Sequence, residues 1–345
     1  MRNSAAYMTG IREMVIRDIP YPDIKEDEVL VKMEYVGICG SDVHYYEKGR
    51  IGSFVVSGDF ILGHEGAGVV VGVGERVDAL KIGQRVALEP GIPCGHCYYC
   101  KRGNYHLCPD VRFLATPPYD GCFRNYIAYP ANMVFPLPPQ VSSKDGALVE
   151  PLSVGIHAVE QGNVELGDSV VILGAGCIGL MTLLASKARG VSNIIVVDIM
   201  DNRLEKALEM GATHVINAKK EDLMKTSDKI TKEHGSDVVF ETAGSDITAK
   251  QTVRLVRRGG TVVLVGMSAK DSFEYDFSSL MAKEATIKTV FRYKNVYPAA
   301  ISALASGNID LSKLNPAEYM FYDIKQAFED NINLKNEITK IVIKM

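Results

Sequence analysis

The sequence lacks the marks of several protein classes. No apolar run is long enough to cross a bilayer, and the first residues do not join a basic start to an apolar core and a cleavage site. We therefore expect a cytoplasmic protein with no membrane partner. The formal net charge is only -4, and without a basic excess we expect no nucleic-acid partner. Repeats and low-complexity tracts are also lacking. The composition is that of a globular protein, and its 345 residues are enough for two domains.

The hydrophobic pattern changes near Pro151. Before it, valine-rich runs at 28–38 and 66–77 predict strands joined by loops. After it, apolar strands alternate with helices, which favours a parallel sheet covered on both faces in a doubly wound α/β domain. The predicted strands are 169–173, 193–198, 215–217, 237–241 and 261–266, and the helices are 152–159, 177–189 and 201–210. Beyond Val290 we expect helices at 297–305 and 324–331 and a last strand at 338–344.

A glycine-rich turn follows the strand predicted at 169–173. Gly174, Gly176 and Gly179 match the G-x-G-x-x-G pattern, in which the glycines allow a tight turn, close approach to a pyrophosphate and close helix packing. Asp198 ends the next strand, about 20 residues on, where its carboxylate can bind the adenosine ribose. No arginine follows directly to bind a 2′-phosphate, so NAD is favoured over NADP, and Arg203 lies one turn further on, near the adenine. The alternative is a turn that serves packing alone.

Seven cysteines in a chain without an export signal indicate metal ligation rather than disulfides. Cys94, Cys97, Cys100 and Cys108 crowd into one segment, and four thiolates converging on one ion make a closed, structural zinc site. Such a site would order residues 90–118, which have too little apolar periodicity to pack by themselves. An iron–sulfur cluster, which four thiolates also suit, is the alternative.

Four more possible metal ligands are scattered through the first 150 residues: Cys39, His64, Glu65 and Glu150. Their spacing does not bring them together. Taken singly, each suits a core thiol, a hydrogen-bonded imidazole or a surface carboxylate. Their neighbours are more informative, because residues 37–44 read GICGSDVH and residues 63–68 read GHEGAG.

These two segments resemble the catalytic-zinc segments of the zinc-dependent medium-chain dehydrogenase family. The cysteine-rich segment and the glycine motif follow in that family's order. Within the family the sequence is most similar to the sorbitol (polyol or xylitol) dehydrogenases, through residues 42–52, 147–158 and 290–293. The resemblance implies an α/β protein. A GroES-like, mainly β catalytic domain with the zinc lobe would cover residues 1–150 and 291–345, and a doubly wound Rossmann domain for NAD would cover residues 151–290.

The resemblance also implies roles for single residues. Cys39, His64 and Glu65 would hold a catalytic zinc, with Glu150 as a further ligand or as the holder of water there, and Asp42 would orient a ligand. Ser41 and His44 would carry the proton away, unless His44 only binds the ribose. The substrate-binding set would be Tyr45, Glu150, Arg292 and Tyr293. The cofactor-binding set would be Gly174, Gly176, Ile178, Gly179, Asp198, Arg203, Val265, Gly266, Met267, Val290, Phe291 and Arg292.

The predicted function is the zinc-dependent oxidation of a polyol, sorbitol or xylitol, to the ketose, with hydride transfer to NAD. We expect two zinc ions per chain, one catalytic and one structural, and a homo-oligomer, either a tetramer or a dimer. One alternative is an NAD- and zinc-dependent dehydrogenase of another alcohol, such as 2,3-butanediol, threonine or a simple alcohol. The other is a non-catalytic protein that binds zinc and a dinucleotide. Two zinc ions per chain fit an enzyme, whereas one fits a scaffold that holds only the lobe.

Overall fold

The computed structural model describes residues 3–268 and 272–345. The chain divides into two compact units. The first contains Met1–Glu150, Tyr297–Ser306 and Asn315–Met345, and the second contains Pro151–Val296 and Gly307–Leu314. The first crossing therefore falls at Pro151, where the hydrophobic pattern changes. The chain re-enters the first unit at Tyr297, six residues later than the expected position 291, and it returns to the second unit for residues 307–314.

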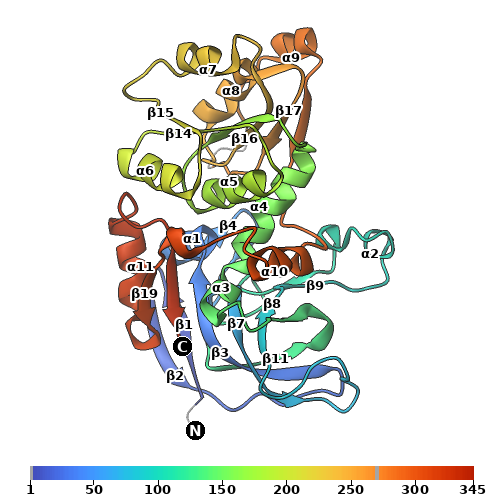
Figure 1. Ribbon diagram of the computed structural model, residues 1–345. Coiled ribbons are helices and arrows are strands. Elements are labelled where there is room, and N and C mark those ends of the chain that lie inside the picture. The colour runs from blue at the N-terminus through green and yellow to red at the C-terminus, as the bar shows by residue number, and fades with distance from the viewer. Residues whose placement is uncertain (1–2, 269–271) are drawn as a thin grey trace. The chain divides into compact units, whose positions relative to one another are not determined.

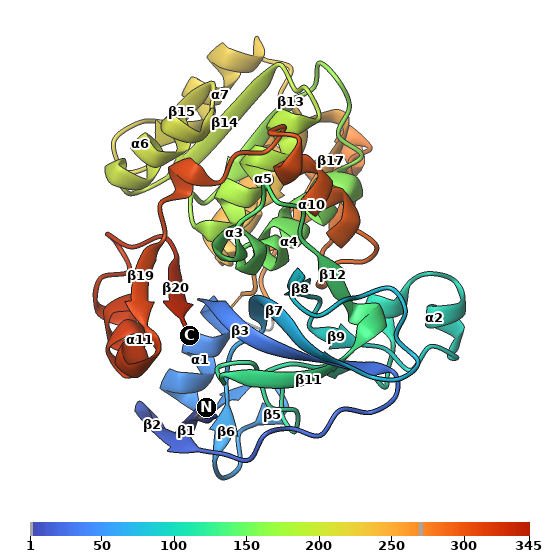
Figure 2. The same ribbon diagram turned by 60° about the horizontal axis from the view of Figure 1, so that its bottom comes forward.

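A seven-stranded sheet organises the first unit around β3 (Glu28–Ile38). The strand order is β12-β8-β7-β3-β20-β19, and β11 also pairs with β3. On one edge of β3, β11 pairs with residues 28–32 and β20 with residues 35–38, so the end of the chain lies beside its beginning (Figure 2). The other strands are β7 (Glu65–Val73), β8 (Arg85–Leu88), β11 (Tyr126–Pro130), β12 (Val134–Pro136), β19 (Ala317–Met320) and β20 (Ile341–Lys344).

Smaller elements complete the first unit. A three-stranded sheet has the order β2-β1-β6, and two pairs of short strands are β4 with β5 and β9 with β10. The bounds are β1 (Ser4–Gly10), β2 (Glu13–Asp18), β4 (Arg50–Ile51), β5 (Phe54–Val55), β6 (Phe60–Ile61), β9 (Gly91–Ile92) and β10 (Arg112–Phe113). The helices are α1 (Gly40–Lys48), α2 (Tyr98–Lys101), α3 (Ser143–Ala147), α10 (Tyr297–Ala305) and α11 (Ile324–Asn333).

The second unit is built on a six-stranded parallel sheet with the order β15-β14-β13-β16-β17-β18. Counted from β13, this is the order 3-2-1-4-5-6 of the doubly wound dinucleotide-binding fold, so the predicted fold is confirmed. The strands are β13 (Ser169–Leu173), β14 (Asn193–Asp198), β15 (His214–Asn217), β16 (Ser236–Glu241), β17 (Val256–Leu264) and β18 (Thr286–Thr289). In such sheets ligands bind beyond the carboxyl ends of the strands where the order reverses, here between β13 and β16.

Helices cover both faces of this parallel sheet. Helices α5 (Cys177–Ala188) and α6 (Asp201–Met210) lie on one face, and α7 (Leu223–Thr231), α8 (Asp246–Leu255) and α9 (Phe277–Lys283) lie on the other (Figure 1). Helix α4 (Val149–Gly162) enters the unit from Pro151. No helix in residues 3–268 and 272–345 is long and apolar enough to span a membrane.

Most predicted elements of the parallel sheet occur within a few residues of the expected positions, but some ends differ. The strand predicted over 261–266 is β17, which stops at Leu264 because the N–H groups of Val265 and Gly266 turn to the carbonyl of Glu241 (2.8 and 2.9 Å). The last strand starts at Ile341, since the N–H of Ile338 closes a helical turn onto Leu334 (2.9 Å). Both ends are set by backbone partners that the hydrophobic pattern does not contain.

Candidate active site

Three of the predicted zinc ligands come together in the first unit. A sulfur of Cys39, a ring nitrogen of His64 and a carboxylate oxygen of Glu65 all lie within 4.8 Å of one another. The sheet produces this cluster, because Gly37 near the end of β3 pairs with Glu65 at the start of β7. Cys39 follows β3 directly and caps α1, so its sulfur stands beside the first residues of β7.

Asp42 ties the two halves of this cluster together. Its side chain is fully buried, and its two oxygens accept hydrogen bonds from the N–H of Cys39 (3.0 Å) and the N–H of Gly63 (2.9 Å). The oxygen that faces Gly63 also lies 3.4 Å from Nδ1 of His64. Burial opposes protonation of His64, but the Asp42 carboxylate and the Cys39 thiol outweigh it and raise the pKa of the imidazole well above its ordinary value. Asp42 therefore orients the ring, as expected for a partner behind a metal ligand.

The donor set suits a zinc ion. A thiolate, an imidazole and a carboxylate are the ligand types that zinc takes, and three protein ligands are the number that leaves a position for substrate in catalytic sites. Glu150 is buried near the start of α4, but it does not belong to the set of atoms within 4.8 Å. Among the described residues, the set of ligand atoms within 4.8 Å therefore has Glu65 as its carboxylate.

Lys340 is a member of this site that the sequence analysis did not identify. Its Nζ contacts the carboxylate of Glu65 and donates a hydrogen bond to the carbonyl of Ile38 (2.9 Å). Both charged side chains are buried, at 4% exposure for Lys340 and 1% for Glu65. The only sequence signal is a lysine directly before an apolar strand, which is too common to indicate a site.

The residues expected to move a proton or bind substrate lie on several elements. Ser41, His44 and Tyr45 are on α1, where Ser41 is half-buried, His44 is exposed and Tyr45 packs edge-on against Phe60. Arg292 and Tyr293 belong to the second unit. Tyr293 is buried, whereas Arg292 has a left-handed backbone (φ 57°) and places its guanidinium 4.7 Å from the centre of the adjacent Phe291 ring.

The four-cysteine lobe converges on one point. The sulfurs of Cys94, Cys97, Cys100 and Cys108 lie within 4.8 Å of one another, with 4.0 Å between Cys94 and Cys100 and 3.4 Å between Cys97 and Cys100. A tetrahedral zinc about 2.3 Å from each sulfur requires sulfurs about 3.8 Å apart. Backbone N–H groups of His96 and Cys97 lower the pKa of Cys94 to about 6, which favours the thiolate.

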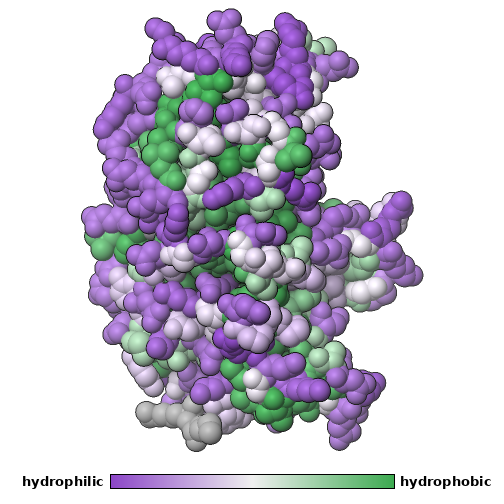
Figure 3. Space-filling model, in the orientation of Figure 1, coloured by the Kyte–Doolittle hydropathy of each residue, from purple (hydrophilic) through white to green (hydrophobic). Residues whose placement is uncertain are grey.

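The lobe has no apolar core that could replace an ion. In residues 94–108 only Cys108 is buried. Figure 3 shows the lobe around α2 as a projecting part of the first unit with a largely hydrophilic surface. A bound metal can order a segment that has no apolar core, and the four thiols of this one fit a structural zinc.

The glycine motif of the second unit has the geometry that a dinucleotide requires. Gly174 adopts a left-handed conformation (φ 106°), which permits the turn after β13. At Gly179 a Cβ would overlap the carbonyl of Gly174, whereas at Gly176 a Cβ would meet nothing within 4 Å. The second glycine therefore faces open space at the start of α5, where free N–H groups can bind phosphate.

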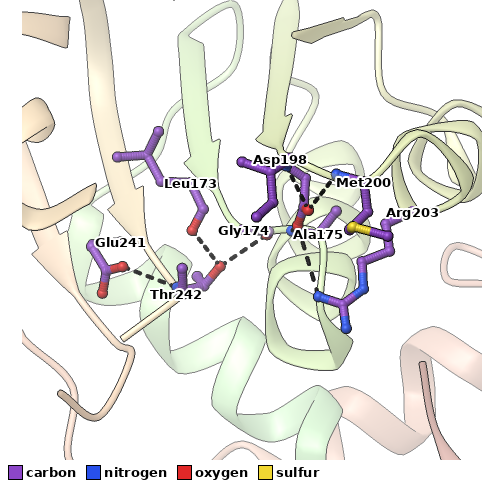
Figure 4. A network of polar contacts seen from close by, with 10 residues as sticks. Leu173, Gly174, Ala175, Asp198, Met200, Arg203, Glu241 and Thr242 are labelled. Carbon is purple, nitrogen blue, oxygen red and sulfur yellow. Dashed lines mark hydrogen bonds and ion pairs between the residues drawn. The ribbon is translucent and has the colours of Figure 1, made fainter. Parts of the chain in front are cut away.

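Asp198 is bound to the glycine turn (Figure 4). Its carboxylate accepts hydrogen bonds from the N–H of Ala175 (2.8 Å) and, beyond β14, from those of Ile199 (2.7 Å) and Met200 (3.0 Å). A guanidinium nitrogen of Arg203 lies 4.0 Å from the same side chain. The carboxylate thus sits at the end of the second strand beside the phosphate-binding turn, as the spacing predicts.

Two residues at the carboxyl end of β16, Glu241 and Thr242, were not predicted from the sequence. Thr242 donates through its hydroxyl to the carbonyls of Leu173 (2.9 Å) and Gly174 (3.0 Å), and Glu241 accepts from the N–H of Ala243 (3.0 Å; Figure 4). The backbone carbonyl of Glu241 also holds the segment of Val265 and Gly266. Met267 is exposed after it, and Ile178 and Val290 are half-buried. Glu241 and Thr242 therefore brace the carboxyl ends of three strands, which is a tertiary role with no local motif.

Comparison with known proteins agrees with both halves of the chain. Residues 25–139 match the alcohol dehydrogenase GroES-like domain, and residues 177–306 match the zinc-binding dehydrogenase family. The chain is 47% identical to the uncharacterized zinc-type alcohol dehydrogenase-like protein YdjJ of Escherichia coli, covering 100% of this chain and 99% of the relative. It is 45% identical to a sorbitol dehydrogenase of Bacillus subtilis, covering 98% and 96%.

A solved structure gives the same result. The structure of an Escherichia coli oxidoreductase/dehydrogenase of unknown specificity, involved in membrane biogenesis, matches with a TM-score of 0.96 at 46% identity, over 100% of this chain and 99% of the other. The expected family and the expected pair of folds are therefore confirmed. The chain belongs to the zinc-dependent medium-chain dehydrogenase family, close to its sorbitol dehydrogenases, and is an oxidoreductase that acts on an alcohol.

Proposed function

We propose that this enzyme oxidises a polyol, sorbitol or xylitol, to the ketose and reduces NAD. The observation that carries the proposal is the cluster of Cys39, His64 and Glu65, in which a carboxylate takes the third place of a three-residue zinc site. The 45% identity with a sorbitol dehydrogenase over nearly the whole chain supports the substrate class. A polyol has several hydroxyls that can pair with hydrogen-bonding groups of the site. A substrate without these hydroxyls leaves those groups unpaired, so the site discriminates strongly against it.

The proposed roles combine the family resemblance with the geometry of the three-residue cluster. When bound by Cys39, His64 and Glu65, zinc would act as a Lewis acid that lowers the pKa of the substrate hydroxyl. Asp42 holds the imidazole of His64 in orientation through its buried carboxylate. Glu150 would hold water or a substrate hydroxyl near the cluster. Ser41 and His44 would carry the proton away. Tyr45, Arg292 and Tyr293 would bind the other hydroxyls of the substrate.

NAD is the proposed cofactor rather than NADP. Asp198 keeps a carboxylate beside the glycine turn, and a negative charge there repels a 2′-phosphate while accepting hydrogen bonds from a ribose. Arg203 is the nearest cation, and its guanidinium is drawn to Asp198 itself (4.0 Å). The test compares kcat/KM for NAD and NADP. Preference for NADP in the unaltered enzyme would refute this part of the proposal.

The full proposal includes two zinc ions per chain, one in the cluster and one in the lobe, and a homo-oligomer. The oligomer is supported by β18, an edge strand whose four residues are all exposed, because an open strand edge can pair with a second copy. Metal analysis of the purified protein and sedimentation velocity test the two statements. One zinc per chain would leave only the lobe occupied, and a monomer at micromolar concentration would exclude the oligomer.

The decisive experiment follows NADH formation with sorbitol, xylitol, 2,3-butanediol, threonine and ethanol, with and without a zinc chelator. We expect chelator-sensitive turnover of sorbitol or xylitol and little turnover of the other three. A Glu150→Gln variant should lose kcat/KM for the polyol while it keeps its zinc, since Glu150 lies outside the three-residue cluster. Faster turnover of ethanol or threonine than of either polyol would refute the substrate class.

A further inference from the structure

Three neighbouring strands place a buried lysine beside the zinc cluster. The order β7-β3-β20 is set by pairing of Gly37 with Glu65 on one side and with Val342 on the other. Lys340 lies directly before β20, two residues before Val342, and its ammonium group contacts the carboxylate of Glu65. Its Nζ can reach Glu65 because the intervening position on β3 is Gly37, which has no side chain to cross.

Gly37 leaves room for this contact in a specific way. A Cβ at that position would overlap an oxygen of the Glu65 carboxylate, the same Oε2 that Lys340 contacts. The carboxylate therefore leans over the bare glycine toward the lysine. Lys340 also donates to the carbonyl of Ile38 (2.9 Å), one residue before Cys39. One ammonium group thus holds both the backbone next to the thiol ligand and the side chain of the carboxylate ligand.

The contact between the Lys340 ammonium group and the Glu65 carboxylate affects how Glu65 can bind a metal. At 1% exposure, Glu65 cannot rely on water to stabilise its charge, and Lys340 is the cation that contacts it. A carboxylate has two oxygens, and one of them faces the ammonium group. An oxygen held by the ammonium group is a poorer donor to a metal, so Glu65 would bind the metal through its other oxygen. A carboxylate without the lysine beside it could offer both.

We propose that Lys340 is a positioning residue that limits Glu65 to one metal-ligand oxygen and so keeps one coordination position open for substrate. The inference rests on the proposed zinc site and concerns how that site is kept open. Lys340 does not touch the substrate. It acts by competing with the metal for the second oxygen of Glu65.

The test measures zinc release rather than turnover alone. Zinc-loaded enzyme is mixed with a colorimetric chelator, and the release of zinc is followed over time. The kinetic phase that is missing in the Cys39→Ala variant is assigned to this cluster. In Lys340→Met we expect zinc release in that phase to slow by on the order of tenfold, which is the size typical of substitutions at residues that contact a metal ligand. Release should slow because the lysine no longer competes with the metal for the Glu65 carboxylate. kcat should fall at the same time, because the position for substrate is closed. Lys340→Arg should release zinc like the unaltered enzyme, since it restores the cation.

Control variants separate this effect from general damage. In a Glu65→Gln background, adding Lys340→Met should not change zinc release, because no charged carboxylate remains to compete for. Lys344→Met, at the exposed far end of β20, should leave release unchanged. Faster release from Lys340→Met, or an equal effect in both backgrounds, would overturn the proposal. A cobalt-substituted enzyme adds a second readout, as bidentate Glu65 raises the coordination number and weakens the visible absorption bands.

A test without variants covers the case in which Lys340→Met does not fold. A crystal structure of the zinc-loaded enzyme should show one oxygen of Glu65 on the metal and the other on Lys340. Both oxygens on the metal, or Lys340 turned away, would overturn the proposal. An enzyme that holds zinc in this way but does not oxidise polyols would contradict the proposed function alone, whereas a cluster that binds no zinc would end both.

Discussion

The buried Asp42 allows the most direct test of how the site is built. Asp42→Asn keeps the shape of the side chain but leaves one oxygen where two are needed, for the N–H of Cys39 and the N–H of Gly63. The amide NH2 must then face one of these donors. A hydrogen bond to a charged group contributes about 1.5–3 kcal/mol, and an unpaired buried donor costs about 1–3 kcal/mol. We therefore expect the free energy of unfolding to fall by about 2–4 kcal/mol.

The same change should loosen the metal. Without the carboxylate, His64 loses the partner that lies 3.4 Å from its Nδ1, and zinc release from the cluster should become on the order of 10–100-fold faster. Zinc release is measured with a chelator, and stability by urea unfolding of the zinc-free protein. Asp59→Asn is the matched control, because Asp59 is exposed and pairs with the exposed Arg17. Unchanged stability and unchanged zinc release in Asp42→Asn would show that Asp42 does not organise the cluster.

Three further predictions concern other parts of the chain. Burial raises the pKa of Glu89 to about 7 against an opposing hydrogen bond from Tyr105, so the folded protein binds this proton more tightly than the unfolded chain does. The free energy of unfolding should therefore fall as pH rises from about 4.5 to about 7, and Glu89→Gln should remove a pH-dependent loss of about 3 kcal/mol. Urea unfolding at pH 5 and pH 8 measures this loss. The same dependence of stability on pH in the variant would contradict the prediction. Gly179→Ala should abolish NAD binding in calorimetry, because the new methyl group overlaps the carbonyl of Gly174, and normal affinity would be the contrary result. Cys97→Ser should remove one zinc per chain and speed amide exchange throughout residues 94–108, whereas protection equal to that of the unaltered lobe would show that no metal orders it.

Local patterns were sufficient for much of the second unit. Strands at 169–173 and 193–198 and the helix at 201–210 occur as predicted, because each is a continuous apolar or amphipathic run with turn residues at its ends. The right-handed connection of such units then restricts the order of the strands. The first unit was less predictable. Helix α1 has the composition GSDVHYYEK, which has no clear apolar stripe, and its start depends on the cap formed by Cys39 and Asp42.

The candidate site divides in the same way. The four-cysteine cluster could be predicted from spacing, since the ligands lie within 15 residues and a loop can bring them to one ion. Lys340 could not, because it lies 275 residues from Glu65 and the two meet only when β20 pairs with β3. Glu241 and Thr242 were missed for a related reason, as they act across strands on Leu173, Gly174 and Val265.

The sequence by itself determined the residue types on which the chemistry depends: thiols, an imidazole and carboxylates that suit zinc, and a glycine turn with an acidic partner that suits a dinucleotide. The four-cysteine lobe and the glycine turn are set by residues at short spacing, which local geometry constrains. Only the tertiary structure decided that Cys39, His64 and Glu65 share one cluster and that Lys340 contacts the carboxylate. The physical reason is that these contacts depend on strand pairing between distant segments. Pairing is selected by burial of the whole sheet rather than by any local pattern.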